Sequence, residues 1–234
     1  MDDFSVRFSS DIVLVDENAF SDSDINRVEL NEGLETIAYR AFYNSKLENK
    51  ELILPSTVTS VGEEAFANIF REEKGFSHIE LPEDLKSLGK SAFSSFESDI
   101  KCDELVIGKK LTKIAEGAFN NLWTSGFVVN PKNPEYSSED GCLLDASGEK
   151  LIAVPQGKQG EFRVPDSVKR IEKYAFHECG EITDIYIGPG VSSINPQAIY
   201  FSDMTHRIVI HGQKGSEAEH FAVSRGYEWK EDAE

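Results

Sequence analysis

The sequence predicts an α/β solenoid, in which repeated coils stack to form a parallel β-sheet of about nine short strands. Three observations predict this fold. An apolar residue, three further residues and Ala-Phe recur, as in "SVGEEAFANIF" at 60–70 and "KIAEGAFNNLW" at 113–123. The copies share one register of apolar positions. A hairpin-like insertion interrupts the series, and a capped helix signal closes it. Self-similarity at a fixed period is the sequence signature of stacked repeats.

The register is defined from an apolar residue twelve positions before the aromatic residue of each Ala-Phe pair. This position 0 is occupied by Phe8, Leu30, Leu54, Leu81, Ile107, Val164 and Ile187. Positions −2, +4, +7, +11 and +12 are apolar in every copy. Position +11 is always Ala, and position +12 is Phe except for Ile199 in the last copy. Chance does not give this agreement in a chain that is only 39% hydrophobic.

The spacing within one copy indicates its local structure. Apolar residues at −2 and 0 alternate as on one face of a strand. Pro55, Pro82 and Pro165 follow position 0 and are expected to end that strand. Positions +7, +11 and +12 have the spacing of one helix face, so we expect a short helical segment there. The Ala at +11 predicts a tight contact between coils, and the Phe at +12 predicts a core side chain.

Two further strand-like segments match the register without a complete copy, "FVV" at 127–129 and "IVI" at 208–210. We place Phe127 and Ile208 at −2, which puts Val128 and Val209 at −1. Nine strands then start roughly 22 to 27 residues apart, with one interval of about 35. In that long interval, "CLLD" and "KLIAV" flank "ASGE", which predicts a β-hairpin with Gly148 in the turn.

These boundaries give one domain over 1–234. Five repeats fill 1–126, a repeat interrupted by the hairpin fills 127–161, two repeats fill 162–207, and a strand with a helical cap fills 208–234. Ser216 and Glu219 form a capping-box pattern for a helix through "EAEHFAVSR", which Gly226 is placed to end. "YEW" is expected to add a last edge strand.

The amino-terminal end has no comparable cap. The first copy begins at Val6, and terminal repeats normally need polar caps. Either the charges near "DDF" suffice, or a preceding domain or a partner's edge covers this coil.

The charge restricts the partners. The chain has 42 acidic and 24 basic residues, a formal net charge of −18. We therefore expect no nucleic-acid partner and no binding to anionic membranes, because both would be repelled. The sequence has no apolar run long enough to span a bilayer, so we expect no membrane insertion. Its acidic start does not resemble a signal peptide, so as given it is expected to be cytoplasmic unless an export signal lies outside it.

The units "LPSTVTSVGEEAF", "LPEDLKSLGKSAF" and "VPDSVKRIEKYAF" resemble the bacterial surface-antigen (BspA-like) leucine-rich repeat family. The stretch "NPEYSSEDGCLLDASGEKLIAVPQGKQGEFRVP" resembles that family's interrupting hairpin module, and "IHGQKGSEAEHFAVSRGYEW" resembles its closing segment. The resemblance covers essentially the whole chain. It implies a right-handed, parallel-strand solenoid with a binding role, often on secreted or cell-surface proteins.

No motif indicates catalysis, a cofactor or a bound metal. "GQKGSEAE" at 212–219 lacks the phosphate-loop order, and "HECG" lacks the second His of a zinc-protease helix. "SDSD" at 21–24 and "SSED" at 137–140 are calcium-like but are better explained as solvated loops. Cys102, Cys142 and Cys179 have neither zinc nor redox spacing and are expected to be buried thiols. An enzyme built around the 130–160 insertion is the least favoured alternative.

The outward side chains of the strands are the candidate binding residues. Positions −3 and −1 must point away from the core, and nine strands at about 4.8 Å spacing would give a continuous face roughly 40 Å long. Apolar residues alternate there with carboxylates, as on protein-binding surfaces. The structural alternative is that β-branched residues simply favour strands. The candidate residues are Glu29, Glu51, Ile53, His78, Glu80, Glu104, Val106, Glu161, Arg163 and Tyr186.

The sequence thus predicts a non-enzymatic module that binds a basic or mixed-charge protein through this acidic, partly apolar face. The alternative is a structural spacer or adhesin segment of a larger surface protein that binds a host protein or glycan. That alternative includes self-association through the amino-terminal edge.

Overall fold

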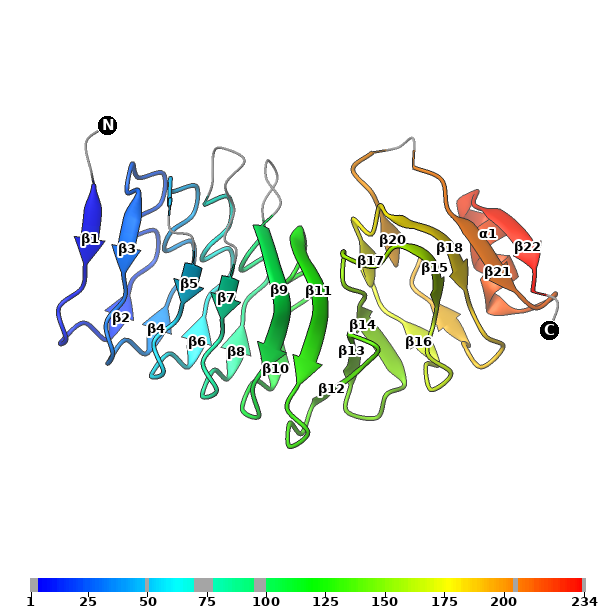
Figure 1. Ribbon diagram of the computed structural model, residues 1–234, viewed down its shortest axis with the longest axis horizontal. Helices are drawn as coiled ribbons and strands as arrows, with labels where there is room; N and C mark the ends of the chain where they lie inside the picture. The colour runs from blue at the N-terminus through cyan, green and yellow to red at the C-terminus, as the bar shows by residue number, and fades with distance from the viewer. Residues whose placement is uncertain (1–3, 49–50, 70–77, 95–99, 204–205, 233–234) are drawn as a thin grey trace. The chain divides into compact units, whose positions relative to one another are not determined.

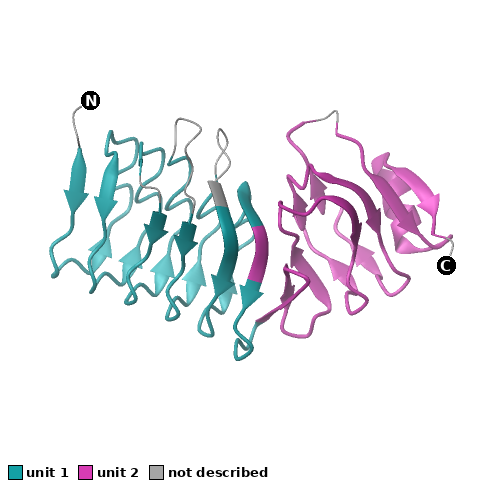
Figure 2. Ribbon diagram, viewed as in Figure 1, with its two compact units in different colours: residues 1–124, 128–135 teal, residues 125–127, 136–234 magenta. Residues whose placement is uncertain are grey.

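The computed structural model describes residues 4–48, 51–69, 78–94, 100–203 and 206–232. Two compact units make up the chain (Figure 2). Unit 1 comprises residues 1–124 and 128–135, and unit 2 comprises residues 125–127 and 136–234. The solenoid prediction is confirmed, because in each unit successive coils place parallel strands beside one another (Figure 1).

The front strands of unit 1 occupy the expected register positions. They are β1 (Ser5–Arg7), β3 (Arg27–Glu29), β5 (Glu51–Ile53), β7 (His78–Glu80), β9 (Ile100–Ile107) and β11 (Leu122–Val129), the last of which contains residues of both units. Side chains at −2 are buried from the second coil onward, and those at −3 and −1 point outward. The alternation read from the sequence is therefore confirmed.

The continuous front sheet that the sequence predicted is not formed in the described part of unit 1. Its front strands pair only as β1 with β3, β5 with β7 and β9 with β11. Phe8 N–H donates to Glu29 C=O, and Leu54 N–H donates to Glu80 C=O. The equivalent bond from Leu30 N–H to Ile53 C=O is missing between the described strands β3 and β5.

A second parallel sheet lies where the sequence predicted helical segments. It has the order β10-β8-β6-β4-β2 and is built from β2 (Leu14–Val15), β4 (Thr36–Ile37), β6 (Ser60–Val61), β8 (Ser87–Leu88) and β10 (Lys113–Ile114). The expectation of a helical segment in each copy is wrong for the described residues. Positions +7, +11 and +12 all point inward in a two-residue strand followed by tight turns, just as they would on one helix face.

Hydrogen bonds within and between coils fix these turns. Ala41 N–H donates to Ala38 C=O in its own coil, whereas Phe42 N–H donates to Ala65 C=O of the next coil. Arg40 and Asn44 adopt left-handed backbone angles, with φ of 52° and 53°. Each turn therefore satisfies alternate N–H groups locally and the others across the coil boundary.

The Phe residues at +12 form a stacked column inside unit 1. The ring centroids of Phe20, Phe42, Phe66 and Phe93 are 5.3, 5.2 and 5.5 Å apart in sequence order, and successive rings are nearly parallel. Phe42, Phe66, Phe93 and Phe119 are all buried, as are the Ala residues at +11 from Ala41 onward. The predicted core is confirmed.

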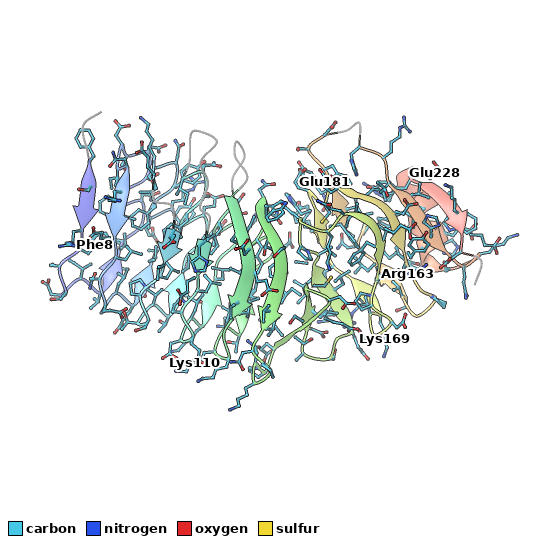
Figure 3. The ribbon with its side chains drawn as sticks, viewed as in Figure 1. Phe8, Lys110, Arg163, Lys169, Glu181 and Glu228 are labelled. Carbon is cyan, nitrogen blue, oxygen red and sulfur yellow. The ribbon has the colours of Figure 1, made fainter. Side chains whose placement is uncertain are left out.

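The core weakens at the first coil. Ala19 is exposed, and Val6, Phe8, Ile12 and Phe20 are only half-buried. Phe8 lies on this coil (Figure 3). Its ring packs against the Phe20 ring in an edge-to-face arrangement, with the ring centroids 5.7 Å apart. In the coils that follow, Leu30 and Ile114 are the residues at repeat positions that are only half-buried among those described.

Unit 2 repeats the same plan of a front sheet and a second sheet. Its front sheet has the order β15-β18-β21-β22, formed by β15 (Gly160–Arg163), β18 (Ile182–Tyr186), β21 (Val209–Gly212) and β22 (Glu228–Glu231). Its second sheet runs β12-β13-β14-β16-β19, formed by β12 (Tyr136–Glu139), β13 (Cys142–Asp145), β14 (Lys150–Ala153), β16 (Arg170–Ile171) and β19 (Ser193–Ile194). A small pair joins β17 (Phe176–His177) to β20 (Ile199–Tyr200).

The predicted hairpin is formed by β13 and β14, which pair antiparallel. Gly148 has a φ of 73° in the turn, and its N–H donates to Asp145 C=O. The sequence missed β12, which pairs antiparallel with β13. Because β14 also pairs parallel with β16, the insertion extends the second sheet of the solenoid.

The helical cap is α1 (Glu217–Arg225), the single α-helix among the described residues. Gly226 ends it in the left-handed conformation, with φ of 77°, as predicted. The predicted capping box is not formed. The Ser216 side chain makes no capping bond, and Glu219 accepts a hydrogen bond from the N–H of Gly215, one residue before the N-cap Ser216. The predicted last edge strand is β22, which pairs parallel with β21.

Candidate binding face

The outward candidate side chains of the front strands are exposed in both units, except Tyr186, which is half-buried like its neighbours Asp184, Val209 and His211. In unit 1 these include the candidates Glu29, Glu51, Ile53, His78, Glu80, Glu104 and Val106, which together are called the front face below. Unit 2 carries Glu161, Arg163 and Tyr186. Strand alternation places all of them opposite the core, as the sequence predicted.

On β3, Glu29 is engaged by the neighbouring coil. Its carboxylate accepts a hydrogen bond from Arg7 Nε at 2.6 Å, across the parallel pair in which Arg7 and Glu29 are opposite residues. Both side chains are largely exposed, so this ion pair adds little stability, commonly below about 1 kcal/mol.

The paired strands β5 and β7 bring four candidates together. Glu51 is opposite His78, and Ile53 is opposite Glu80. His78 Nε2 lies 3.9 Å from a Glu80 carboxylate oxygen. Ile53 is 53% exposed, which is unusual for a large aliphatic side chain beside three polar residues. The pair therefore presents one apolar projection within a mainly acidic patch.

A similar arrangement recurs on β9. Val106 is 56% exposed, and Glu104, two residues earlier on the same strand, is exposed too. The two residues lie on one side of β9 because side chains two apart share a face. Unit 1 thus repeats the combination of a carboxylate and an aliphatic side chain on two strands.

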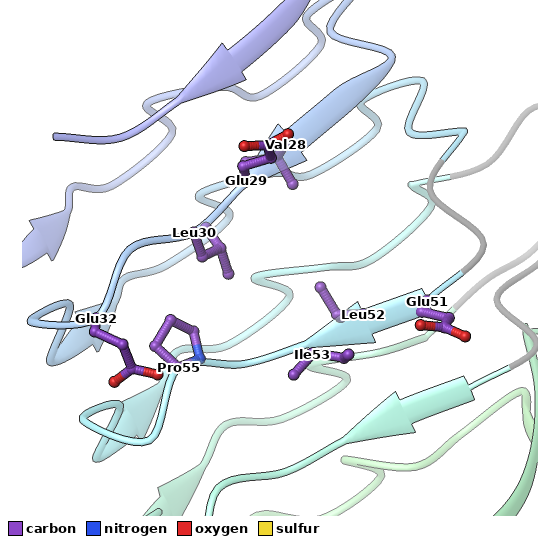
Figure 4. A pocket seen from close by; sticks show the side chains of 8 residues that line it. All are labelled: Val28, Glu29, Leu30, Glu32, Glu51, Leu52, Ile53 and Pro55. Atoms are coloured by element: carbon purple, nitrogen blue, oxygen red, sulfur yellow. The ribbon is translucent and has the colours of Figure 1, made fainter. Parts of the chain in front are cut away.

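A cleft of about 340 Å³ lies between β3 and β5 (Figure 4). Its apolar lining comes from Val28, Leu30, Leu52, Ile53 and Pro55, and its acidic residues are Glu29, Glu32 and Glu51. Leu30 and Leu52 reach into the space between the two strands in Figure 4. The cleft lies where the front sheet lacks a strand pairing, so Leu30 remains half-buried although the buried Leu54 occupies the same register position one coil later.

On unit 2, Arg163 projects from β15 (Figure 3) onto an aromatic stack. Its guanidinium carbon lies 4.0 Å from the Tyr186 ring centroid, and the other neighbour of Tyr186 is the His211 imidazole, at 4.2 Å between centroids. Arg163 also lies 3.7 Å from Asp232. The strand register explains this row, because Arg163, Tyr186 and His211 are opposite one another on three parallel strands.

His211 of this row, and Asp184, two residues before Tyr186 on β18, were absent from the candidates. Asp184 Oδ1 lies 2.7 Å from His211 Nε2, and this hydrogen bond, followed by one from Thr183, lowers the pKa of the Asp184 carboxyl. Burial, and after it the nearby carboxylates, raise the pKa of Tyr186.

The register assigned to 208–210 was wrong by two residues. Ile210, not Ile208, is opposite Ile185, so Val209 is opposite Asp184 and His211 is opposite Tyr186. A shift of two residues keeps the same side chains facing the core, so the apolar pattern could not distinguish the two registers.

The three cysteines and His177 lie away from these faces, and burial shifts their pKa values. Cys102, Cys142 and Cys179 are buried free thiols, and burial raises the pKa of Cys102 to about 11 and that of Cys142 to about 12. Thiols with such pKa values are poor nucleophiles. Burial also lowers the pKa of His177 to about 4.

Acidic side chains of the calcium-like loops at 21–24 and 137–140 form hydrogen bonds or ion pairs with other residues of the chain. Asp22 accepts a hydrogen bond from Asn44 Nδ2, and Asp24 forms an ion pair with Lys46. Glu139 accepts a hydrogen bond from Ser167. In the described ranges, no group of three or more His, Cys, Asp or Glu residues is arranged to hold a metal ion. No helix in the same ranges is long and apolar enough to cross a membrane.

The fold and its outward faces define a parallel-strand repeat solenoid of the kind that presents an extended binding surface. The family model described as "BspA type leucine rich repeat region" matches residues 4–125 and 157–223, in six copies. The chain therefore belongs to the BspA-type leucine-rich repeat family. Leucine-rich repeat proteins are in general interaction or surface modules rather than enzymes. A search of curated proteins found no match.

Solved structures share this fold at low sequence identity. A leucine-rich cell-surface protein from Faecalibacterium prausnitzii is 21% identical, with a TM-score of 0.63 over 83% of this chain and 57% of its own. The pneumococcal vaccine antigen PcpA is 15% identical, with a TM-score of 0.59 over 99% of this chain and 80% of its own. A leucine-rich repeat protein from Eubacterium ventriosum is 22% identical, with a TM-score of 0.52 over 82% and 61%. The chain thus spans 57% of the length of the Faecalibacterium protein.

Proposed function

We propose that the chain is a non-enzymatic interaction module that binds a basic or mixed-charge protein through the front face of unit 1. One observation carries the proposal: Ile53 and Val106 are each more than half exposed and lie beside the carboxylates of Glu51, Glu80 and Glu104. Apolar projections within a charged surround are typical of protein-binding surfaces.

The charge of the chain determines the class of partner. A formal charge of −18 repels polyanions and attracts cationic surfaces over roughly one Debye length, about 8 Å at physiological salt. Complementary charge mainly raises the association rate, whereas buried aliphatic side chains slow dissociation. A partner with Lys or Arg residues around an apolar patch satisfies both requirements.

The test is selection of peptides from a random display library on the immobilised chain, followed by binding measurements on the selected peptides. We expect peptides rich in Lys or Arg with at least one apolar residue. The variant Glu51→Lys, Glu80→Lys, Glu104→Lys should lose their binding while its thermal unfolding changes little, because all three side chains are exposed.

A matched control changes the net charge equally at another place. Glu17, Glu35 and Glu63 are exposed and lie outside the front strands. Reversing these three to Lys should weaken binding only slightly. Equal loss of binding in both variants would show that overall charge, rather than the front face, holds the peptides, and full binding by the front-face variant would refute the proposal.

A second function is supported by the first coil. Phe4, Val13 and Leu14 are 57%, 54% and 45% exposed, and β1 and β2 are the outermost strands of their sheets. An apolar edge of this kind favours strand-to-strand association. The chain would then act as a structural or adhesive segment at a cell surface, in line with the description of the Faecalibacterium protein as a cell-surface protein.

Sedimentation of the isolated chain distinguishes this second function. A concentration-dependent dimer that Leu14→Lys converts to a monomer would support association through the first coil. A monomer at every concentration would exclude it and leave the front face as the supported surface.

A further inference from the structure

The second and third coils of unit 1 are close on one side and apart on the other. Their second-sheet strands β4 and β6 pair in register, with Thr36 opposite Ser60 and Ile37 opposite Val61. Their front strands β3 and β5 do not pair, and most Cα–Cα distances between those strands exceed 8 Å. Paired strands lie about 4.8 Å apart, so the front sheet is open at this point.

Hydrogen bonds close the opening at both ends. Glu48 N–H donates to Asn26 C=O at 2.7 Å before the two strands begin. Beyond them, Glu32 accepts hydrogen bonds from Ser56 N–H at 3.2 Å and from Ser56 Oγ at 2.8 Å. The cleft is therefore a bounded hollow that opens toward solvent, which suits an inserted side chain better than a whole added strand.

The floor of the cleft is apolar and already desolvated. Val28 and Leu52 are almost fully buried, Pro55 is buried, and Leu30 is half-buried. A volume of about 340 Å³ is at the lower end of the range of roughly 300–1,000 Å³ for ligand pockets. A pocket of this size fits a single apolar anchor, the type of group that contributes most of the energy at protein interfaces.

The rim of the cleft is acidic. Glu29 and Glu32 are held by Arg7 and Ser56, whereas Glu51 is exposed and makes no ion pair with any described residue. Glu80 lies one strand further on, opposite Ile53. A cation placed beside the apolar anchor would thus meet the Glu51 carboxylate at the cleft entrance.

We propose that the cleft between β3 and β5 receives one aliphatic side chain of a protein partner, from an extended segment in which Lys or Arg residues flank that side chain. The proposal rests on the function proposed above and names the chemistry of the partner at that face. The aliphatic side chain contacts Leu30 and Leu52, and a flanking cation pairs with Glu51.

The test uses three synthetic peptides with the full chain labelled at its Leu, Ile and Val methyl groups: Ac-GKLKG-amide, Ac-GKGKG-amide and Ac-GELEG-amide. We expect Ac-GKLKG-amide to shift the methyl resonances of Leu30, Leu52 and Ile53 and to bind about tenfold more tightly than Ac-GKGKG-amide, from burial of the added side chain. Ac-GELEG-amide should not bind.

Two variants and one control locate the site. Leu30→Phe narrows the cleft, and we expect it to remove the preference for Ac-GKLKG-amide over Ac-GKGKG-amide. Glu51→Gln should weaken the binding of Ac-GKLKG-amide several-fold. Because Glu51 is exposed, this substitution should leave the fold unaffected. Glu63→Gln is the control, at an exposed position outside the front strands, and should not weaken binding of this peptide.

The outcomes separate this proposal from the broader one. Equal binding of Ac-GKLKG-amide and Ac-GKGKG-amide, or shifts confined to methyl groups away from the cleft such as those of Val106, would overturn the cleft while leaving the acidic front face supported. Absence of shifts at the cleft methyl groups up to about 10 mM peptide would also overturn it, because that corresponds to negligible affinity. If the triple reversal at Glu51, Glu80 and Glu104 also left peptide selection unchanged, both proposals would fail.

Discussion

Tyr186 stacks on His211, with ring centroids 4.2 Å apart and ring planes inclined by 15°. Because Arg163 covers the other side of the Tyr186 ring, both faces of this aromatic side chain are occupied within unit 2. Tyr186 therefore presents its edge and hydroxyl group to a partner. It does not offer a free ring face for stacking against a sugar, which weakens the expectation of glycan binding at this residue.

The hydrogen bond from His211 to Asp184 leads to a prediction about acid stability. Removing the imidazole in His211→Ala should raise the pKa of Asp184 toward its ordinary value of 3.8, because that bond is the largest cause of the lowered value. A lowered carboxyl pKa stabilises the fold above the ordinary pKa, and this contribution disappears as pH falls through the folded-state value. The stability difference between wild type and variant should therefore shrink below about pH 4.

NMR titration of the Asp184 carboxyl carbon measures this directly. Thr183→Val is the control, since Thr183 contributes the second-largest lowering and should give a smaller rise. An unchanged Asp184 pKa in His211→Ala would contradict the prediction.

His177 predicts a second pH dependence of folding stability, in a different pH range. Its imidazole lies 5.0 Å from the Tyr200 ring in a stacked arrangement, its Nδ1 is buried without a partner, and burial lowers its pKa to about 4 from 6.5. The unfolded chain binds a proton at His177 more readily, so stability is lost as pH falls from about 6.5 toward 4. For this half-buried side chain we expect about 1 kcal/mol less stability at pH 5 than at pH 7 from this residue.

Urea unfolding at the two pH values tests this. His177→Phe keeps the ring stacking and removes the titrating group. The free energy of unfolding of this variant should therefore fall less between pH 7 and pH 5 than that of wild type. His78→Phe, at an exposed position, serves as the control and should behave like wild type. The same pH dependence in wild type and His177→Phe would rule out this role for His177.

The repeated residues predicted most of the fold because a solenoid uses the same inward positions in every coil. The strand positions, the Phe column, the hairpin and the carboxyl-terminal cap all follow from local spacing and turn chemistry. The choice between a helix and a strand with turns did not follow, because +7, +11 and +12 point inward in both. The register of β21 was ambiguous because Ile208 and Ile210 are equally suited to the core.

The cleft was not predictable for a different reason. Leu30 and Leu54 occupy the same register position, yet only Leu54 donates its N–H to the next front strand. Pairing depends on how far two coils separate, which is a property of neighbouring coils rather than of the pattern inside one coil. The outward residues were identified from alternation alone, but their grouping into paired strands required the structure.

Close coil spacing predicts that Gly62 cannot be replaced by Ala without cost. A Cβ atom at Gly62 would lie 2.6 Å from Ala38 C and 2.7 Å from Tyr39 N, both backbone atoms of the preceding coil. Since backbone cannot move aside as a flexible side chain can, we expect Gly62→Ala to destabilise the chain by about 1–3 kcal/mol. Gly188→Ala is the matched control, because a Cβ there would meet nothing within 4 Å. Urea midpoints that fall equally in the two variants would show that coil spacing is not the cause.

The Phe column predicts a gradient of sensitivity along unit 1. Phe66 is fully buried between Phe42 and Phe93, so Phe66→Ala should cost about 3–5 kcal/mol, the range for a large cavity in a packed core. Phe20→Ala removes a half-buried ring near the start of the column, where solvent already reaches part of the side chain, and should cost clearly less. Chemical denaturation followed by tyrosine and tryptophan fluorescence measures both losses. If Phe20→Ala proved as destabilising as Phe66→Ala, the first coil would have to be as well packed as the interior, contrary to the exposure of Ala19, Val13 and Leu14.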